Sequence, residues 1–263
     1  MVDIVDKTLT INDVETHIKI GGTGAPLLFL HGFSLGNLWL PFHDQLAEHF
    51  TVYAPDHPGS GLSAMPDWFD TMDDMVLHYI SLLNELQLDK VTVVGLSLGG
   101  WLAAELASFY PERINQLVLI AAAGLRVPNV PVADLFALSP EQLFSLCFQD
   151  LSHAMVLMSQ LDMSDPIKLI LADYRERTML ARLAWNPGYS PKLARRLARV
   201  TAPSLIIWGK EDRLIPAAYG TAYQAALPNA RLEIIEDCGH IPILEATETT
   251  IKLIHEFLSQ EQQ

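Results

Sequence analysis

Apolar residues follow two patterns along the chain: short continuous runs, and positions at helical spacing. The runs are typical of strands that are buried on both faces of a parallel sheet. Apolar residues three or four positions apart are typical of helices that pack one face on a core. We therefore expect strands at residues 26–30, 51–54, 91–94, 117–121, 204–208 and 231–235, and helices at residues 71–88, 101–107, 216–227 and 242–258.

The first twenty residues alternate apolar and polar side chains instead. Asn12 and Asp13 stand within this alternation, and both residue types are favoured in tight turns. The pattern predicts a β-hairpin ahead of the alternating strands and helices. The strand-then-helix order that follows, with connections this long, indicates a parallel sheet with helices on both faces.

Between residues 125 and 200 the strand-like runs stop. This segment has helical patterns separated by prolines, and we expect helices at residues 132–149, 151–161, 165–185 and 191–199. We interpret the segment as a helical cap inserted into a single α/β domain. In this interpretation residues 1–124 and 201–263 form the core domain, and residues 125–200 form the cap.

Composition limits the partners and the location of the protein. The chain has 263 residues, 50% of them hydrophobic, and a formal net charge of -14 without a basic cluster, so we expect no binding to nucleic acid. We find no signal peptide and no apolar run of the roughly 20 residues that span a bilayer. We therefore expect a cytoplasmic protein, either a monomer or a homodimer. Cys147 and Cys238 lack metal-ligand spacing and are expected to be free thiols, and we expect no metal and no cofactor.

A glycine-rich corner carries the candidate nucleophile. The expected strand at residues 91–94 is followed by Gly95, Ser97, Gly99 and then a helical pattern. In a G-x-S-x-G motif with this context the turn is so tight that the residues around the serine need small side chains, and the hydroxyl projects above the sheet edge. Free N–H groups at the start of the helix lie beside it. The context therefore predicts that Ser97 is a nucleophile.

A serine hydroxyl needs a base to take its proton and an acid to orient that base. Side chains that follow the strands of a parallel sheet meet at its carboxyl edge. Asp212 and His240 follow the last two expected strands, and the order Ser97, Asp212, His240 is the one expected of this kind of hydrolase. We therefore predict a catalytic triad of these three residues, with Asp212 preferred over Glu211 and Asp237 as the acid.

With these residues identified, the sequence resembles the α/β-hydrolase fold, in the branch of capped esterases and carbon–carbon bond hydrolases. The resemblance covers nearly the whole chain, in the motifs His31-Gly32, 56–63, 95–100, 111–114, 209–216 and Gly239-His240. It implies a mostly parallel eight-stranded sheet with helices on both faces. It also implies that the main-chain N–H groups of Phe33 and Leu98 form an oxyanion hole.

The same resemblance suggests which residues line the substrate pocket: His31, Phe33, Leu98 and Ile241. We expect His31 to support the oxyanion loop rather than to act as a base, and His57 to belong to a turn. Asp56 is expected to fix that turn. The remaining histidines fall on elements that are predicted to lie at the surface, and we assign no role to them: His17, His43, His49, His78, His153 and His255.

The type of nucleophile indicates the reaction. Dehalogenases and epoxide hydrolases of this fold carry aspartate at the corner, so the serine implies acyl transfer through an acyl-enzyme. We expect a serine hydrolase that acts as a carboxylesterase. Its partner would be a small-molecule ester of small to medium size, and the Leu, Met and Phe content of the cap suggests an apolar substrate.

Other reactions stay open. A carbon–carbon bond hydrolase of meta-cleavage products is one alternative, although Leu96 and Ile241 depart from the residues usual there beside nucleophile and base. Its diacid substrate would need cations, for which Arg175, Arg177 and Arg182 in the cap are candidates. A thioesterase or lactonase would use the same site. A non-catalytic ligand-binding receptor of this fold is an alternative from a different class.

Overall fold

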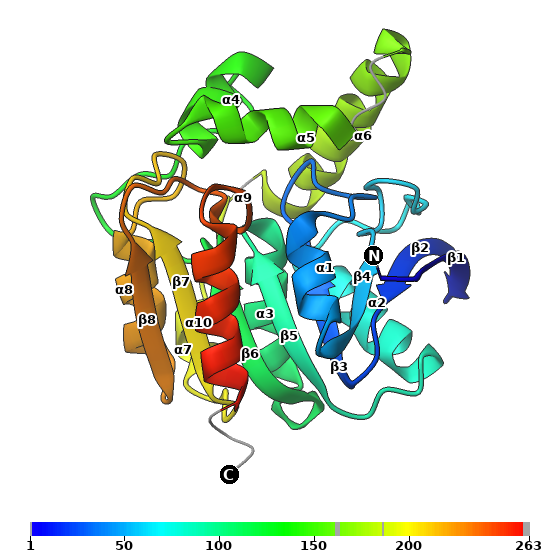
Figure 1. Ribbon diagram of the computed structural model, residues 1–263, viewed down its shortest axis with the longest axis horizontal. Coiled ribbons are helices and arrows are strands. Elements are labelled where there is room, and N and C mark those ends of the chain that lie inside the picture. The colour runs from blue at the N-terminus through cyan, green and yellow to red at the C-terminus, as the bar shows by residue number, and fades with distance from the viewer. Residues whose placement is uncertain (1, 161–163, 186, 260–263) are drawn as a thin grey trace.

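A single eight-stranded sheet organises the described part of the chain, which confirms the predicted class of fold (Figure 1). The computed structural model describes residues 2–160, 164–185 and 187–259. The strand order is β1-β2-β4-β3-β5-β6-β7-β8, and the pairs from β4 onward are parallel. The strands are β1 (Ile4–Ile11), β2 (Val14–Gly21), β3 (Ala25–Leu30), β4 (Phe50–Pro55), β5 (Val91–Leu96), β6 (Ile114–Ile120), β7 (Ser204–Gly209) and β8 (Ala230–Ile235).

The first two strands form the predicted hairpin at one end of the sheet. They pair antiparallel along their whole length. The turn residues Asn12 and Asp13 have φ angles of 47° and 64°, the left-handed conformation that a two-residue hairpin turn requires. Because β2 also pairs with β4, it is an interior strand, and side chains on it, such as His17, are buried.

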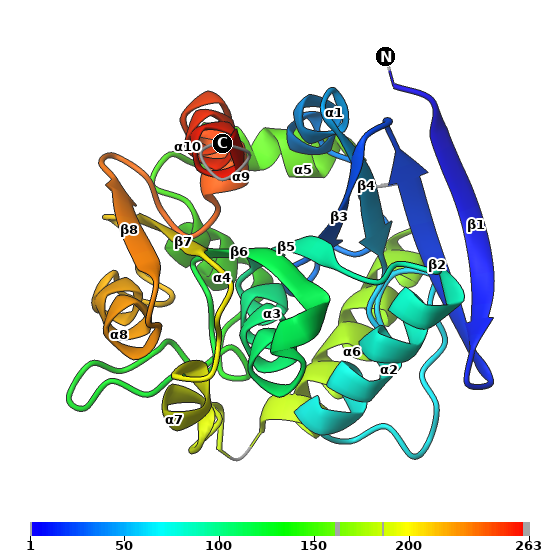
Figure 2. The same cartoon turned by 90° about the horizontal axis from the view of Figure 1, so that it is seen from below.

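Helices cover both faces of the sheet (Figure 2). On one face lie α1 (Pro41–Ala47) and α10 (Thr247–Ser259), and on the other lie α2 (Met72–Glu85), α3 (Leu98–Phe109) and α8 (Ala218–Ala226). Every residue of β5 and β7 is buried as a result. This two-sided covering is the reason why the central strands read as continuous apolar runs in the sequence.

The first predicted helix of the cap is shorter than the sequence pattern suggested. Of residues 132–149, only α4 (Pro140–Cys147) is helical. Ser139 caps this helix by accepting a hydrogen bond from the N–H of Gln142, and a proline in the first turn fixes the start. The apolar residues before Ser139 are therefore in loop structure, and their spacing misled the prediction.

The predicted closing helix, residues 242–258, is two helices in the structure. The first is α9 (Pro242–Glu245), and α10 follows. The backbone leaves the helical conformation at Ala246, where φ is -139° and ψ is 46°. This break lets the short helix follow the loop of His240 while α10 packs along the sheet.

The first three α-helices of the predicted cap segment lie over the carboxyl ends of the strands (Figure 1). There lie α4, α5 (Ala154–Gln160) and α6 (Pro166–Ala184), whereas α7 (Leu193–Leu197) packs against α3 and α8. The 3-10 helix η2 (Leu151–His153) precedes α5, and a second, η1 (Pro111–Arg113), precedes β6. Residues 161–163 and 186 lie outside the described residues, including the last residue of the predicted helix 151–161. The division at residues 125 and 200 stays a prediction.

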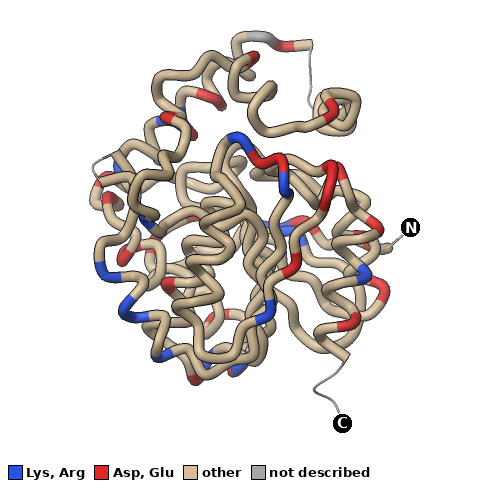
Figure 3. Tube along the Cα trace, turned by 90° about the vertical axis from the view of Figure 1, so that its left-hand side faces the viewer, with Lys and Arg blue, Asp and Glu red and all other residues tan. Residues whose placement is uncertain are grey.

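Charged residues are spread over the molecule. Acidic and basic positions are interspersed along the trace in Figure 3. The net charge of -14 arises from 31 Asp and Glu residues against 17 Lys and Arg residues. Within the described ranges, no helix has both the length and the apolar character needed to cross a bilayer.

Candidate active site

Ser97 lies between the end of β5 and the first residue of α3. Its φ of 53° and ψ of -112° are rare for a residue with a side chain. Main-chain hydrogen bonds hold this conformation: the Ser97 N–H donates to the Ile120 oxygen at 2.9 Å, and the Ser97 oxygen accepts from the Ala123 N–H at 3.0 Å. A Cβ atom on Gly99 would lie 2.1 Å from the Leu30 carbonyl oxygen, so the turn needs glycine there. The strained corner that the motif predicts is present.

The structure brings the three residues of the predicted triad together. His240 Nε2 lies 2.9 Å from Ser97 Oγ, and His240 Nδ1 lies 2.8 Å from Asp212 Oδ2. The other oxygen of Asp212 accepts from the N–H groups of Leu214 at 2.9 Å and Ile215 at 2.8 Å. Asp212 is 5% exposed and His240 is 3% exposed, so water competes little for these contacts. The arrangement is that of an acid, a base and a nucleophile in one relay.

The loop after β3 approaches the serine from the other side. A Cβ atom on Gly32 would lie 3.3 Å from Ser97 Cβ, which places Phe33 next to the nucleophile. Leu98 is the first residue of α3, where N–H groups have no partner within the helix. Among the residues that the structure describes, no acceptor pairs with the N–H of Phe33 or Leu98. Both amides are therefore available to an oxyanion.

A narrow cavity of about 40 Å³ opens at the Ser97 hydroxyl. Two of the four predicted pocket residues, Phe33 and Ile241, line it, whereas His31 and Leu98 do not. The lining is almost entirely apolar, and three of its members, Leu135, Leu143 and Cys147, come from the segment of the predicted cap. The lining residues are Gly32, Phe33, Leu35, Leu96, Ser97, Leu135, Leu143, Cys147, Leu214, His240 and Ile241.

His31 is turned toward the loops rather than the cavity. Its Nδ1 contacts the Gly32 oxygen at 2.7 Å, and its Nε2 accepts from the His57 N–H at 3.1 Å. The two imidazole rings stack with their centroids 3.9 Å apart. Burial, with a smaller contribution from the neighbouring His31, lowers the pKa of His57 well below its ordinary value. The pair therefore links the oxyanion loop to the turn that begins at Asp56.

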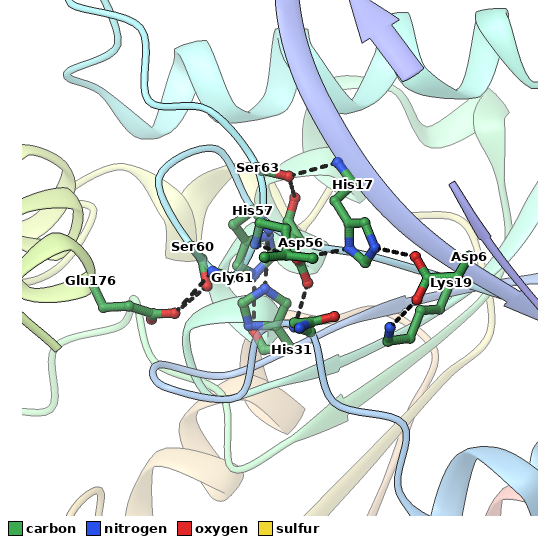
Figure 4. Close-up of polar contacts among 12 residues, drawn as sticks. Asp6, His17, Lys19, His31, Asp56, His57, Ser60, Gly61, Ser63 and Glu176 are labelled. Carbon is green, nitrogen blue, oxygen red and sulfur yellow. Dashed lines mark hydrogen bonds and ion pairs between the residues drawn. The ribbon is translucent and has the colours of Figure 1, made fainter. Parts of the chain in front are cut away.

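The prediction that six further histidines lie at the surface was wrong for three of them: His17, His43 and His78 are buried. Burial lowers the pKa of His43 to about 3 and that of His78 to about 4. His17 lies between two carboxylates, 3.0 Å from Asp56 Oδ2 and 2.5 Å from Asp6 Oδ1 (Figure 4). Asp56 also accepts from two main-chain N–H groups of its loops, so it fixes the turn as expected.

Sequence reasoning missed the contacts between α4 and the loops of the triad. The His240 N–H donates to the Cys147 oxygen at 2.7 Å. Arg213, which follows Asp212, donates to the Phe148 oxygen at 2.7 Å. Glu245 accepts from the N–H of Gly239 at 3.0 Å and from that of Gln149 at 2.6 Å. Apart from the contact between Glu245 and Gly239, which are six positions apart, these contacts join residues far apart in the chain, so no local pattern predicts them.

The thiol of Cys147 lies at the cavity but is a poor candidate for chemistry. Burial, with smaller contributions from Asp212 and Glu245, raises the pKa of Cys147 to about 12. A thiol reacts as its thiolate, which is scarce at such a value. Within the described residues, no group of three or more His, Cys, Asp or Glu side chains is placed to hold a metal ion.

Comparison with known proteins defines the class of protein. The family model described as the alpha/beta hydrolase family matches residues 27–253, and the chain belongs to this family. It is 30% identical to 2-hydroxy-6-oxononadienedioate/2-hydroxy-6-oxononatrienedioate hydrolase 2 of Pseudomonas putida, over 94% of this chain and 92% of that protein. It is 27% identical to human monoacylglycerol lipase ABHD6, over 89% of this chain and 75% of that protein.

Solved structures agree with this assignment. A serine hydrolase involved in carbazole degradation, the CarC enzyme, superposes with a TM-score of 0.81 and 26% identity, over 98% of this chain and 100% of that chain. Meta-cleavage product hydrolases thus appear among the similar proteins, as the resemblance in the sequence suggested. Because the names of these relatives span several substrates, the family does not fix the reaction.

Proposed function

We propose that the protein hydrolyses carboxylic esters of small to medium apolar molecules through an acyl-enzyme. The observation that carries the proposal is the relay from Asp212 through His240 to Ser97, with contacts of 2.8 Å and 2.9 Å, at the mouth of an apolar cavity. Nucleophile, base and acid are each within hydrogen-bond reach, which is the geometric requirement for activating a serine.

In the first half of the reaction His240 Nε2 takes the proton of Ser97 as Oγ bonds to the ester carbonyl carbon. The carbonyl oxygen becomes an oxyanion and accepts from the N–H groups of Phe33 and Leu98. The bond to the leaving alkoxy oxygen then breaks, and that oxygen takes the proton from His240. An acyl-serine and a free alcohol result, while Asp212 stabilises the imidazolium.

In the second half a water molecule replaces the alcohol. His240 takes one proton from the water, whose oxygen bonds to the acyl carbon and forms a second oxyanion in the same place. The bond to Ser97 Oγ breaks, and the proton on His240 returns to that oxygen. The carboxylic acid leaves, and the enzyme is restored with one water consumed for each ester.

The cavity and the cap arginines favour an apolar ester over a dienolic diacid. Arg175 donates to the Ser63 oxygen and Arg182 to the Asp67 oxygen, while Arg177 donates to the Leu135 oxygen and pairs with Asp173. None of the three is among the residues that line the cavity. A diacid would therefore find apolar side chains where it needs cations. The carbon–carbon hydrolase reading keeps support from the Pseudomonas putida relative and remains the second candidate.

The test is a panel of p-nitrophenyl esters of increasing acyl length, run beside 2-hydroxy-6-oxo-6-phenylhexa-2,4-dienoate. We expect turnover of the shorter and medium esters. The variant Ser97→Ala should lose at least about 10³-fold in kcat while it keeps the fold, because the acyl-enzyme has no other nucleophile. Ser81→Ala, on α2 and outside the site, is the matched control.

Two results would contradict the proposal. An undiminished rate in Ser97→Ala would remove the acyl-enzyme. Preference for the dienoate over all esters, measured as kcat/KM, would transfer the assignment to the carbon–carbon hydrolase. Labelling of the wild-type protein by a fluorophosphonate separates either enzyme from a receptor, because a misaligned serine labels poorly.

A further inference from the structure

A single buried carboxylate connects α6 to two loops of the underlying domain. Glu176 is 7% exposed, and its Oε2 accepts from the Ser34 N–H at 2.9 Å. Its Oε1 accepts from the Ser60 hydroxyl and, at 3.4 Å, from the Gly61 N–H. Figure 4 shows Glu176 reaching from its helix toward Ser60 and Gly61. All three partners are donors, which only an acceptor such as a carboxylate satisfies together.

The first of these donors belongs to the oxyanion loop. Ser34 directly follows Phe33, whose N–H is one of the two proposed oxyanion donors. Its φ of 60° marks a sharp change of direction, and the turn is closed by the Leu35 N–H, which donates to the Gly32 oxygen at 3.3 Å. Fixing the Ser34 N–H leaves only the dihedral angles of Phe33 between that anchor and the donor, so the anchor constrains where the donor points.

The neighbours of Glu176 on α6 hold the same two loops. The Arg177 guanidinium carbon lies 5.9 Å from the centre of the Phe33 ring. Arg175 donates to the Ser63 oxygen at 2.9 Å. Three consecutive residues of α6 thus contact the oxyanion loop and the turn after Asp56, with the carboxylate in the middle. This helix touches the loop that the proposed chemistry depends on.

We propose that Glu176 is a positioning residue that makes the oxyanion hole depend on the seating of α6. The inference rests on the proposed function, because it concerns the N–H of Phe33. The cavity has a volume of about 40 Å³, which is smaller than an ester, so groups around it must give way when an ester binds. While α6 is seated, Glu176 holds Ser34, and the Phe33 donor is then in place for the oxyanion.

A residue that merely stabilises the fold would behave differently. Loss of stability lowers the amount of active protein and leaves kcat per folded molecule unchanged. Loss of oxyanion geometry lowers kcat and spares KM, because the oxyanion exists in the transition state and not in the bound ester. A fall in kcat per folded molecule at unchanged KM therefore identifies a positioning role.

The experiment compares Glu176→Gln with Arg182→Met, using p-nitrophenyl esters. Glutamine keeps the shape of the Glu176 side chain but turns an N–H₂ group either toward the Ser34 N–H or toward the donors of Ser60 and Gly61. We expect kcat to fall about 10- to 100-fold with KM within threefold, since removing an oxyanion donor outright costs about 10²–10³. A boronic acid that mimics the tetrahedral intermediate should bind more weakly by the same factor as kcat. Arg182→Met removes a contact of α6 to Asp67 and should change neither quantity beyond twofold.

A second readout does not depend on ester turnover. Hydrogen exchange of the peptide that contains residues 32–37 should be at least tenfold faster in Glu176→Gln and unchanged in Arg182→Met. If wild-type protein hydrolyses no ester, the proposed function fails, and exchange alone decides whether Glu176 holds the loop. Unchanged exchange, or an equal loss of kcat in both variants, would overturn the inference. Should Glu176→Gln fail to fold, Ser60→Ala removes one donor and should show the same pattern with a several-fold effect.

Discussion

Two buried histidines in this protein, His240 and His17, have similar partners at Nδ1 and different partners at Nε2. His240 Nδ1 lies 2.8 Å from Asp212, and His17 Nδ1 lies 3.0 Å from Asp56. Both aspartates also accept two main-chain N–H groups, from one loop for Asp212 and from two loops for Asp56. At Nε2 the partners differ: Ser97 for His240, and Asp6 for His17.

This difference separates a relay that does chemistry from a cluster that holds loops. A histidine with a hydroxyl at its free nitrogen can take a proton from it and return the proton to another oxygen. A histidine between two carboxylates has no nucleophile to activate. Lys19 first, and His17 second, hold the pKa of Asp6 below its ordinary value. An Asp–His pair is therefore a functional signal only together with the third group and a cavity.

The largest expected effect comes from Asp212→Asn. The two loop N–H groups keep the amide oxygen on their side, so the amide N–H₂ faces His240 Nδ1 and forces the proton of the ring onto Nε2. The base then cannot accept the proton of Ser97, and kcat should fall on the order of 10³–10⁴-fold in ester hydrolysis. Glu211→Gln is the matched control, because Glu211 accepts from the Cys238 N–H and does not touch the ring. A loss below tenfold in Asp212→Asn would mean that another carboxylate serves as the acid.

The equivalent change beside His17, Asp56→Asn, should lower the stability of the fold rather than the rate of the reaction. In Asp56→Asn an amide N–H₂ would face His17 or one of two main-chain donors, and a buried hydrogen bond would be lost. We expect the free energy of unfolding, measured in urea, to fall by about 3 kcal/mol. The kcat of the folded protein should fall far less than in Asp212→Asn.

Asp6→Asn is the internal control for this prediction. Asp6 touches the same histidine, but its side chain is 53% exposed, and water replaces what the substitution removes. Its effect on unfolding should stay within about 1 kcal/mol. Equal destabilisation by the two variants would show that the cluster acts as one buried unit and would remove the distinction between its two carboxylates.

The same comparison explains what sequence reasoning could reach. Ser97, Asp212 and His240 each follow a strand of a parallel sheet, and the carboxyl ends of such strands converge by geometry alone. The strands themselves were predictable because the covering helices on both faces leave a continuous apolar run, as in β5 and β7. The fold and the convergence of the triad residues could therefore be predicted from local patterns and one rule of topology.

His17 and Glu176 follow no such rule. The alternating pattern of the hairpin marks His17 as a residue at the surface, but the pairing of β2 with β4 and the closure of the loop at Asp56 bury it. Glu176 reads as one of several charges on a helix, and its partners lie 142 and 116 positions away. Such contacts depend on how segments distant in the chain pack on one another, which no spacing along the chain specifies.

The smallest expected effect concerns buried histidines that have no carboxylate partner. Burial lowers the pKa of His43 to about 3 and of His78 to about 4, while an unfolded chain keeps the ordinary 6.5. The unfolded state then binds more protons below pH 6.5, so stability is complete above that pH and is lost as pH falls toward the folded values. Between pH 7.5 and 5.5 each such histidine should cost about 1.4 kcal/mol of unfolding free energy. His78→Gln should remove about 1.4 kcal/mol of the pH-dependent change in this window. An unchanged pH profile in His78→Gln would mean that the ring already carries a proton in the folded protein.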